Sequence, residues 1–383
     1  MSAPSLHDLS SVIHVHSTYS DGTATVPEIL DAARDAGRDA VLLTDHDSLE
    51  AKRDGWEGWH DGVLLLVGEE VSPRRAHFLA FDIDEEIDRH RVPVAEVPGV
   101  VASRGGFSFA AHPFPHRLRL SKLITQPHPM GRLVDPALCG VELWNLANDT
   151  VARFRHPLEA LRFLRYPDRE LADLPPTHLE AWDRLSAQRR TVAVGALDSH
   201  QPGIRLRGRV RTPLPNRILF GLLGTHLLLD AAPTGELERD RGLLYAALCA
   251  GRCYISRDSL ADPRGFEFWA EPRGAVPVAG DAVAGAGRLE MGDEAPAVAA
   301  GAPEAVAAGG ASPAPGWTIR ARLPQAAELR LLRDGSQVAS AEADALEHST
   351  DSPGVYRLEA RLRAHGTTRI WILSNPIHLR SQG

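Results

Sequence analysis

Histidine and carboxylate side chains stand at the ends of several apolar runs in this sequence. His14 and His16 flank Val15 at the end of one such run, Ser11–Val15. Residues two apart in a strand point to the same face, so both imidazoles can reach one metal ion. Other apolar runs end in the same residue types, and the candidate metal ligands are His14, His16, Asp21, His46, Glu70, His112, Glu142, Asp198 and His200. Buried carboxylates and imidazoles are costly to cluster without cations, so the joint pattern predicts a metal centre.

The elements that must position these residues alternate between strands and helices over roughly the first 260 residues. We expect strands at 11–15, 40–43, 63–67, 76–81, 107–111, 139–144, 191–197, 225–230 and 253–256. Helices are expected at 26–36, 94–104, 176–189 and 236–250. This alternation, with buried apolar strands, indicates a parallel sheet, either open or closed into a barrel. In a parallel barrel the active site forms at the carboxyl ends of the strands, where the candidate ligands fall.

The pattern changes to short strands with turn signals after about residue 260. Asp334-Gly335 lies between two apolar runs and predicts a hairpin. A segment at about 282–316 is rich in Ala, Gly and Pro and is predicted to be a flexible insertion, because it offers too little apolar surface to fold. The sequence therefore predicts two domains: an α/β domain at 1–260 and a small all-β, sandwich-like domain at 261–383.

Composition narrows the classes of partner. The chain has 383 residues and a formal net charge of −8, which favours neither nucleic acid nor an anionic membrane as a partner. Three cysteines are too few for a disulfide framework. No apolar run is long enough to span a bilayer, and the first residues do not resemble a signal peptide. We expect a soluble cytoplasmic protein that acts on a small molecule, and the sequence indicates no oligomeric state.

As an ordered set, the candidate ligands resemble the motifs of the PHP (polymerase and histidinol phosphatase) domain. The resemblance covers roughly residues 10–257 and rests on His14-x-His16, Asp21, Thr44-Asp45-His46, Gly68-x-Glu70, Ala111-His112-Pro113 and Asp198-x-His200. The C-terminal part, with Gly354-Val355-Tyr356 and Ser374-Asn375-Pro376-Ile377, resembles a subgroup that includes proteins similar to carbaryl hydrolases. The resemblance implies a distorted (β/α)7 barrel, two or three divalent metal ions, and phosphoester hydrolysis as the commonest activity. Imidazole and carboxylate ligands together suit zinc, manganese or iron.

The resemblance also assigns ligands to individual ions. It implies that one ion is held by His14, His16, Glu70 and Asp198. Glu70 would bridge to a second ion, which His112 also binds. A third ion would be held by Asp21, His46 and His200. At the position where other members place a further histidine or cysteine on the second ion, this chain offers Glu142.

Catalysis in such a site would use a hydroxide that bridges two metal ions, without a protein nucleophile. The expected catalytic residues are Asp198, Glu70 and His77, where His77 either serves the site or packs within its strand. Asn145 could contact the substrate, although a strand-end turn explains it equally well. Arg205 and Arg207 alternate after His200 and could bind an anionic substrate, or they could form a solvated loop face.

Three functions compete at this point. The first is a metal-dependent phosphoesterase that acts on a small phosphodiester or phosphomonoester. The second is a carbamate, ester or amide hydrolase that uses the same metal site. The third is a non-catalytic interaction module. A phosphate substrate needs cationic groups beside the metals, whereas a carbamate needs an apolar slot.

Overall fold

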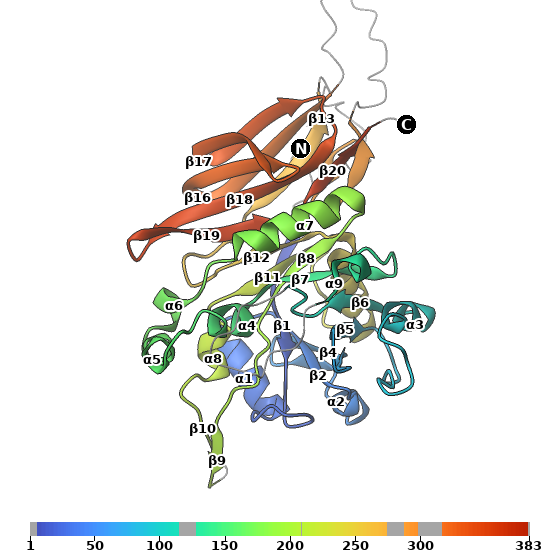
Figure 1. Ribbon diagram of the computed structural model, residues 1–383, viewed down its shortest axis with the longest axis vertical. Coiled ribbons are helices and arrows are strands. Elements are labelled where there is room, and N and C mark those ends of the chain that lie inside the picture. Colours follow the sequence, from blue (N-terminus) through green and yellow to red (C-terminus); the bar gives the residue numbers. More distant parts are fainter. Residues whose placement is uncertain (1–5, 115–127, 208, 274–286, 298–315, 382–383) are drawn as a thin grey trace, which may run out of the picture.

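The computed structural model describes residues 6–114, 128–207, 209–273, 287–297 and 316–381, which form a mixed α/β structure with a large sheet. Figure 1 shows the N-terminal elements below and the C-terminal strands stacked above them, with one long helix between the two parts. The helices are α1 (Val26–Asp35), α2 (Glu50–Arg53), α3 (Val97–Ser103), α4 (Leu146–Val151), α5 (Pro157–Arg165), α6 (Pro167–Glu170), α7 (Pro176–Gln188), α8 (Asn216–Leu219) and α9 (Leu237–Ala250), with a 3₁₀ turn, η1, at Met130–Arg132. None of the described helices is long and apolar enough to cross a membrane.

Seven strands of the described N-terminal part pair in a ring. In order, they are β1 (His7–Val15), β2 (Ala40–His46), β4 (Val63–Val71), β5 (Phe78–Phe81), β6 (Phe107–Ala110), β7 (Leu138–Asn145) and β8 (Val192–Ala196). Neighbours run parallel, except that β5 is antiparallel to both β4 and β6. The residues after β8 return to β1: Leu197 N donates to Ile13 O at 3.0 Å, and Ser199 N donates to His14 O at 3.1 Å. These bonds close the ring. A further strand, β3 (Gly58–His60), pairs antiparallel with β4 outside the ring.

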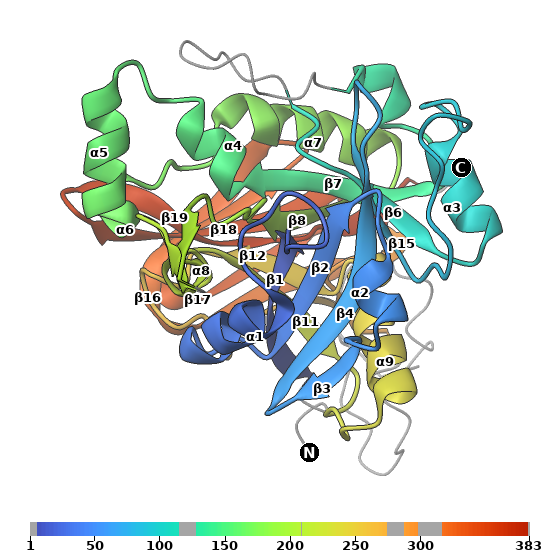
Figure 2. The same ribbon diagram turned by 90° about the horizontal axis from the view of Figure 1, so that it is seen from below.

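Alternate residues of each ring strand enter two different cores, which is why the strands read as continuous apolar runs. Ile13, Leu42 and Leu66 belong to a cluster that also contains Leu244 and Leu248 of α9. Residues of opposite parity, such as Val41 of β2, join α1 and other helices in a second cluster. Figure 2 shows β1, β2 and β4 side by side, and α1 contacts β2 and β4.

Further strands carry the sheet from the ring into the C-terminal part. β11 (Gly224–Leu229) pairs with β1, β12 (Cys253–Ser256) pairs with β11, and β19 (Thr367–Ser374) pairs with β12. The remaining C-terminal strands are β13 (Glu267–Pro272), β14 (Leu289–Glu290), β15 (Glu294–Pro296), β16 (Trp317–Arg333), β17 (Ser336–Thr350), β18 (Gly354–Ala364) and β20 (Ile377–Arg380). They have their own apolar core, which includes Phe268, Leu329 and Trp371. The expected hairpin at Asp334-Gly335 is confirmed, because Arg333 pairs with Ser336.

The predicted flexible insertion at 282–316 differs from the structure where it can be compared. Residues 287–297 carry β14 and β15, and Met291 between them is fully buried. β15 pairs with β20, some eighty residues further along the chain, and so distant a partner leaves no local signal in the sequence. The rest of the predicted insertion lies outside the described residues.

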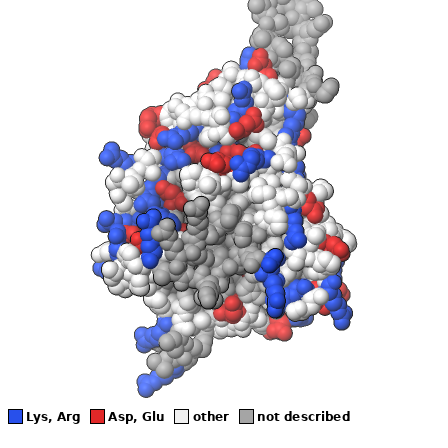
Figure 3. Space-filling view, in the orientation of Figure 1, with Lys and Arg blue, Asp and Glu red and all other residues white. Residues whose placement is uncertain are grey.

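Helix α7 connects the two parts of the molecule. Its Asp183 accepts hydrogen bonds from Arg357 of β18 at 2.7 and 2.9 Å, and its Trp182 is fully buried. On the face seen in Figure 3, cationic and anionic side chains are interspersed over the described surface.

Candidate metal centre

The carboxyl ends of the ring strands bring the predicted ligands together, and β1 does so through a break in its regular alternation. Ile13 packs in the cluster that contains Leu244 and Leu248 of α9. Because side chains two residues apart in a strand point to the same face, an unbroken strand would place Val15 on that face as well. His14 instead has a left-handed backbone, with φ of 65°, and the pairing register with β2 shifts between Ile13 and Val15. Val15 therefore packs in the other cluster, with Val41 and residues of α1. His14 and His16 instead lie beside Glu70.

Glu70 is the centre of the cluster. It lies on β4 with 1% of its side chain exposed, and five imidazoles surround it. Its Oε2 lies 3.1 Å from His14 Nε2, 3.4 Å from His16 Nε2 and 2.9 Å from His46 Nδ1. Its Oε1 lies 2.8 Å from His77 Nδ1 and 3.1 Å from His112 Nε2. Both oxygens of this one carboxylate thus have imidazole nitrogens within 3.4 Å, an arrangement that would suit a carboxylate shared between two ions.

Asp198 approaches the same imidazoles from the end of β8. Its Oδ1 lies 3.5 Å from His14 Nε2, His16 Nε2 and His200 Nδ1. Its side chain keeps 12% exposure, so this carboxylate is reachable from solvent, whereas Glu70 is not.

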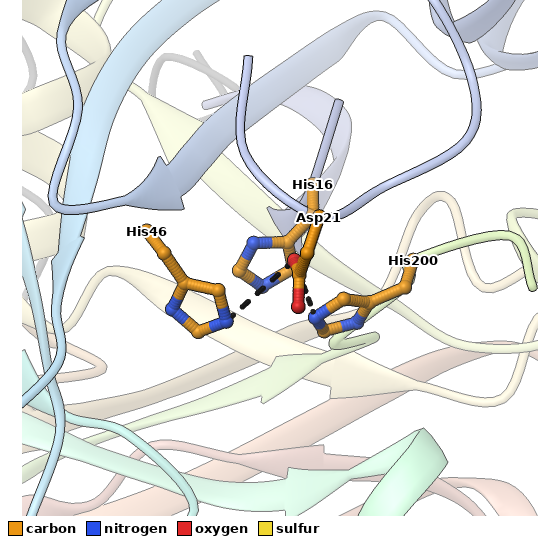
Figure 4. A group of neighbouring side chains, drawn as sticks. All are labelled: His16, Asp21, His46 and His200. Atoms are coloured by element: carbon orange, nitrogen blue, oxygen red, sulfur yellow. Dashed lines mark ion pairs between the residues drawn. The ribbon is translucent and has the colours of Figure 1, made fainter. Parts of the chain in front are cut away.

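A third group of ligands lies at the mouth of the ring and is drawn in Figure 4. Asp21 Oδ1 lies 3.2 Å from His200 Nε2 and 3.7 Å from His46 Nε2. The ring of His16 stacks on that of His200 with 3.9 Å between centroids. The ligand atoms of these four residues all lie within 4.8 Å of one another, close enough to share one ion.

The buried atoms of the cluster lack the partners that a metal-free protein would need. His14 Nε2, both ring nitrogens of His16 and Glu70 Oε2 are buried without a hydrogen bond among the described residues. Such atoms cost free energy unless a ligand satisfies them. Imidazole nitrogens and carboxylate oxygens are donors for zinc, manganese and iron, so the residues present fit a centre of divalent ions.

The pKa values of the histidines are also consistent with a site for divalent cations. Burial lowers the pKa of His14, but the charges of Glu142 and Glu70 outweigh burial and raise this pKa well above its usual value. Burial likewise lowers the pKa of His200, while a hydrogen bond to Asp21 and the charge of Asp198 raise it to about 9. Burial lowers the pKa of His16 to about 4. Protons thus balance the carboxylates in the metal-free cluster, and divalent cations would displace them on binding.

Glu142, a predicted ligand, contacts His14 on the side of the ring that faces away from Glu70. Its Oε1 lies 2.5 Å from His14 Nδ1, the ring nitrogen that faces away from Glu70. Its Oε2 accepts hydrogen bonds from His112 N at 2.6 Å and from Asn145 Nδ2 at 3.0 Å. Both oxygens are therefore engaged, and Glu142 is absent from the described groups that could hold a metal. A carboxylate on the far nitrogen of a ligating histidine orients the ring and increases its basicity.

His77, by contrast, lies among the candidate ligands. It contacts Glu70 Oε1, as His112 does, and its ring centroid lies 5.2 Å from that of His112. Together with His46 and Glu70 it forms one of the groups that could hold an ion.

Of the substrate residues expected from the sequence, the structure describes the side chains of Asn145 and Arg207. Asn145 caps α4 and binds Glu142, which makes it a support for the site. Arg207 has an exposed side chain in the turn between β9 (Ile204–Leu206) and β10 (Arg209–Arg211), a hairpin that projects from the body of the molecule in Figure 1. The Arg205 side chain lies outside the described part of the structure.

Sequence reasoning missed three supporting contacts. Asn148 Nδ2 donates to Asp198 Oδ2 at 2.6 Å. Ser72 Oγ lies 2.6 Å from His46 Nδ1. Asp45 accepts hydrogen bonds from the backbone and hydroxyl of Ser17 at 2.7 and 2.6 Å, which holds the loop before Asp21. Asp45 belongs to the motif Thr44-Asp45-His46, but its contact with Ser17 leaves no signal in the sequence. Asn148 and Ser72 belong to no motif, so only their position in the fold reveals them.

No protein-family model and no curated protein sequence matches this chain. Solved structures that resemble it include a two-domain protein from Bacteroides vulgatus with a predicted PHP-like metal-dependent phosphoesterase, at 14% identity and TM-score 0.43, which covers 98% of both chains. PsfC from Pseudomonas syringae has 15% identity and TM-score 0.40, covering 62% of this chain and 88% of its own. An amidohydrolase from Chromobacterium violaceum has 15% identity and TM-score 0.32, covering 54% of this chain and 92% of its own. With TM-scores below 0.5 these similarities carry no weight for the function, which rests on this chain's own residues.

Proposed function

We propose that this protein is a metal-dependent hydrolase that cleaves small phosphoesters at the carboxyl end of its strand ring. The observation that carries the proposal is the surroundings of Glu70, where five imidazoles converge on one fully buried carboxylate. Several of these nitrogens have no hydrogen-bond partner among the described residues. A structural role would leave that cost uncompensated, whereas divalent cations would satisfy the whole set.

We assign the ligands to three positions. The first ion would be held by His14, His16, Glu70 and Asp198. The second would share Glu70 and be held by His77 and His112, with His77 taking the place that the sequence suggested for Glu142. The third would be held by Asp21, His46 and His200, beside His16.

This arrangement divides the chemistry among the chain's own residues. When bound, divalent ions would lower the pKa of a water molecule and withdraw charge from a phosphoryl oxygen. Asp198 would hold the first ion through Oδ1, and its side chain, the more exposed of the two central carboxylates, would lie next to that water. Glu142 would hold the His14 ring in place through Nδ1. No serine or cysteine nucleophile is required.

The same proposal extends to the fold. We infer that the ring from β1 to β8 is a distorted (β/α)7 barrel of the PHP type. We infer also that the strands from β13 onward form a separate sandwich-like domain, as their own apolar core suggests.

A carbamate, ester or amide hydrolase is the second candidate, and the position of Arg207 favours keeping it. The arginine pair was the feature of the sequence that indicated an anionic substrate. Since Arg207 is exposed in a hairpin turn, it supplies no argument for phosphate over carbamate.

The experiment is hydrolysis of three chromogenic substrates by manganese- or zinc-loaded protein: a p-nitrophenyl phosphate monoester, a bis(p-nitrophenyl) phosphate diester and a p-nitrophenyl carbamate. Asp198→Asn removes a charged ligand proposed for the first ion, while Asp61→Asn changes an exposed surface carboxylate and serves as the matched control. We expect turnover of a phosphate ester by the wild type and by Asp61→Asn, with loss in Asp198→Asn. Turnover of the carbamate alone would replace the proposal with the second candidate. No turnover of any substrate by metal-loaded protein would contradict both.

A further inference from the structure

Helix α4, which follows β7, contacts a proposed ligand of the first ion, Asp198. Asn145 ends β7 and caps α4, since its side chain accepts a hydrogen bond from the backbone N of Asn148 at 2.9 Å. This cap places the Asn148 side chain against Asp198, whose Oδ2 accepts from Asn148 Nδ2 at 2.6 Å. The second contact of the same amide is with Asn145 Oδ1, at 3.2 Å. Both hydrogens of the Asn148 amide are thus used, which fixes its orientation.

The two oxygens of Asp198 therefore have different surroundings. Oδ1 faces the imidazoles of His14, His16 and His200, each at 3.5 Å. Oδ2 faces Asn148. A carboxylate turns easily about its last side-chain torsion, so nothing in Asp198 itself selects which oxygen points to the metals.

We propose that Asn148 is a positioning residue for the metal centre: its amide holds Asp198 so that Oδ1 alone serves the ions. The inference rests on the proposed function, because it assumes that Asp198 binds metal. An amide suits this task because it donates a strong hydrogen bond to a carboxylate without bringing a cation that would compete with the ions.

The same turn of α4 supports the opposite side of the centre. Asn145 Nδ2 donates to Glu142 Oε2, and Glu142 orients His14. One short segment thus holds both a histidine and a carboxylate of the first ion. The cap of α4 uses the backbone N of Asn148, which Asn148→Ala retains; that variant removes only the longer 3.2 Å contact between the side-chain amide and the capping oxygen of Asn145.

The test compares Asn148→Ala and Asn148→Asp with Val151→Ala, which changes an exposed residue of the same helix. The readouts are the dissociation constant for Mn²⁺ by calorimetry, the visible spectrum of the Co²⁺-loaded protein, and the melting temperature without metal. Loss of a residue that orients a metal ligand costs about 10–100-fold in affinity. We expect that loss in both Asn148 variants, together with a changed Co²⁺ spectrum because Asp198 can turn a second oxygen to the ion. The melting temperature should stay within error of the wild type, and Val151→Ala should match the wild type throughout.

Mn²⁺ affinity and a Co²⁺ spectrum unchanged in Asn148→Ala would overturn the inference, as would a change that Val151→Ala shares. The two proposals fail separately. A wild type that binds metal but hydrolyses none of the substrates contradicts the phosphoesterase, while the Mn²⁺ affinities still decide the role of Asn148. A wild type that binds no metal overturns both.

Discussion

Replacing Glu142 with glutamine separates two roles that sequence and structure assign to it, metal ligand and support for His14. In the structure, Oε1 lies against His14 Nδ1 and Oε2 accepts from two donors, His112 N and Asn145 Nδ2. A glutamine has only one acceptor oxygen. In either orientation, the glutamine NH₂ group faces a donor: His14 Nδ1 in one, His112 N and Asn145 Nδ2 in the other. The substitution also removes the negative charge beside His14.

The expected cost follows from this geometry. A partner that orients a ligating histidine contributes about 10–100-fold to metal affinity, or about 1.4–2.7 kcal/mol. We expect Glu142→Gln to bind the same number of ions as the wild type, with one class of site weakened by that factor. Calorimetry with Mn²⁺ gives the affinity, and elemental analysis after gel filtration in excess metal gives the number.

Glu69→Gln is the matched control. Glu69 neighbours Glu70 on β4 and is fully buried, with Ile87 N donating to its Oε2 at 3.0 Å. Burial raises the pKa of Glu69 to about 8, so the carboxyl is mostly protonated at neutral pH and glutamine resembles it closely. This variant should bind metal as the wild type does. The reasoning is refuted if Glu142→Gln loses one whole equivalent of metal while the other ions bind with unchanged affinity, since Glu142 would then be a ligand.

Three further results are expected. The pKa of His200 is about 9 without a bound ion, so an ion at Asp21 and His200 must displace a proton. The apparent dissociation constant of that ion should fall by up to tenfold per pH unit between pH 7 and about 9. A Mn²⁺ affinity that stays constant over this pH range would contradict the prediction. Chelation should lower the melting temperature, since ligand at 100 times its dissociation constant stabilises by about 2.7 kcal/mol, and calorimetric scans that coincide with and without chelator would exclude bound metal. Gly68→Ala should cost about 1–3 kcal/mol in urea unfolding, because its Cβ would lie 2.5 Å from both Ala80 O and Phe81 Cδ1; a variant as stable as the wild type would count against this packing.

The resemblance to the PHP motifs selected Glu70 over Glu69, and strand periodicity agrees with that selection because it fixes which residues share a face. Leu64, Leu66 and Glu70 are separated by even numbers of residues along β4, so their side chains lie on the same face of the strand. Asp198 follows Val194 and Ala196 in the same way. The order of ligands at successive strand ends was therefore visible in the sequence, and the structure brings them together.

The departures arise where position depends on contacts between distant segments. The left-handed backbone of His14 is stabilised by pairing with residues after β8, and three candidate ligands share this unusual conformation, with φ of 65° at His14, 30° at His112 and 52° at Asp198. No local sequence pattern predicts a left-handed backbone conformation at a residue other than glycine.

The proposed exchange of roles between Glu142 and His77 has a similar cause. Both side chains lie next to candidate ligands, and the sequence could not show which would reach Glu70. In the structure, His14 and the backbone of His112 occupy both oxygens of Glu142, while His77 immediately precedes β5, which runs antiparallel to both of its neighbours in the ring. Reversal of that strand brings its first residues, rather than its last, to the site.

The central claim, that Glu70 bridges metal ions, is tested most directly by anomalous diffraction from crystals of manganese-loaded protein. We predict at least two anomalous peaks, one beside each oxygen of Glu70 and roughly 3.5–4 Å apart. One should lie within bonding distance of His14 and His16, and the other within bonding distance of His77 and His112. Fully loaded crystals without an anomalous peak at Glu70 would contradict the claim.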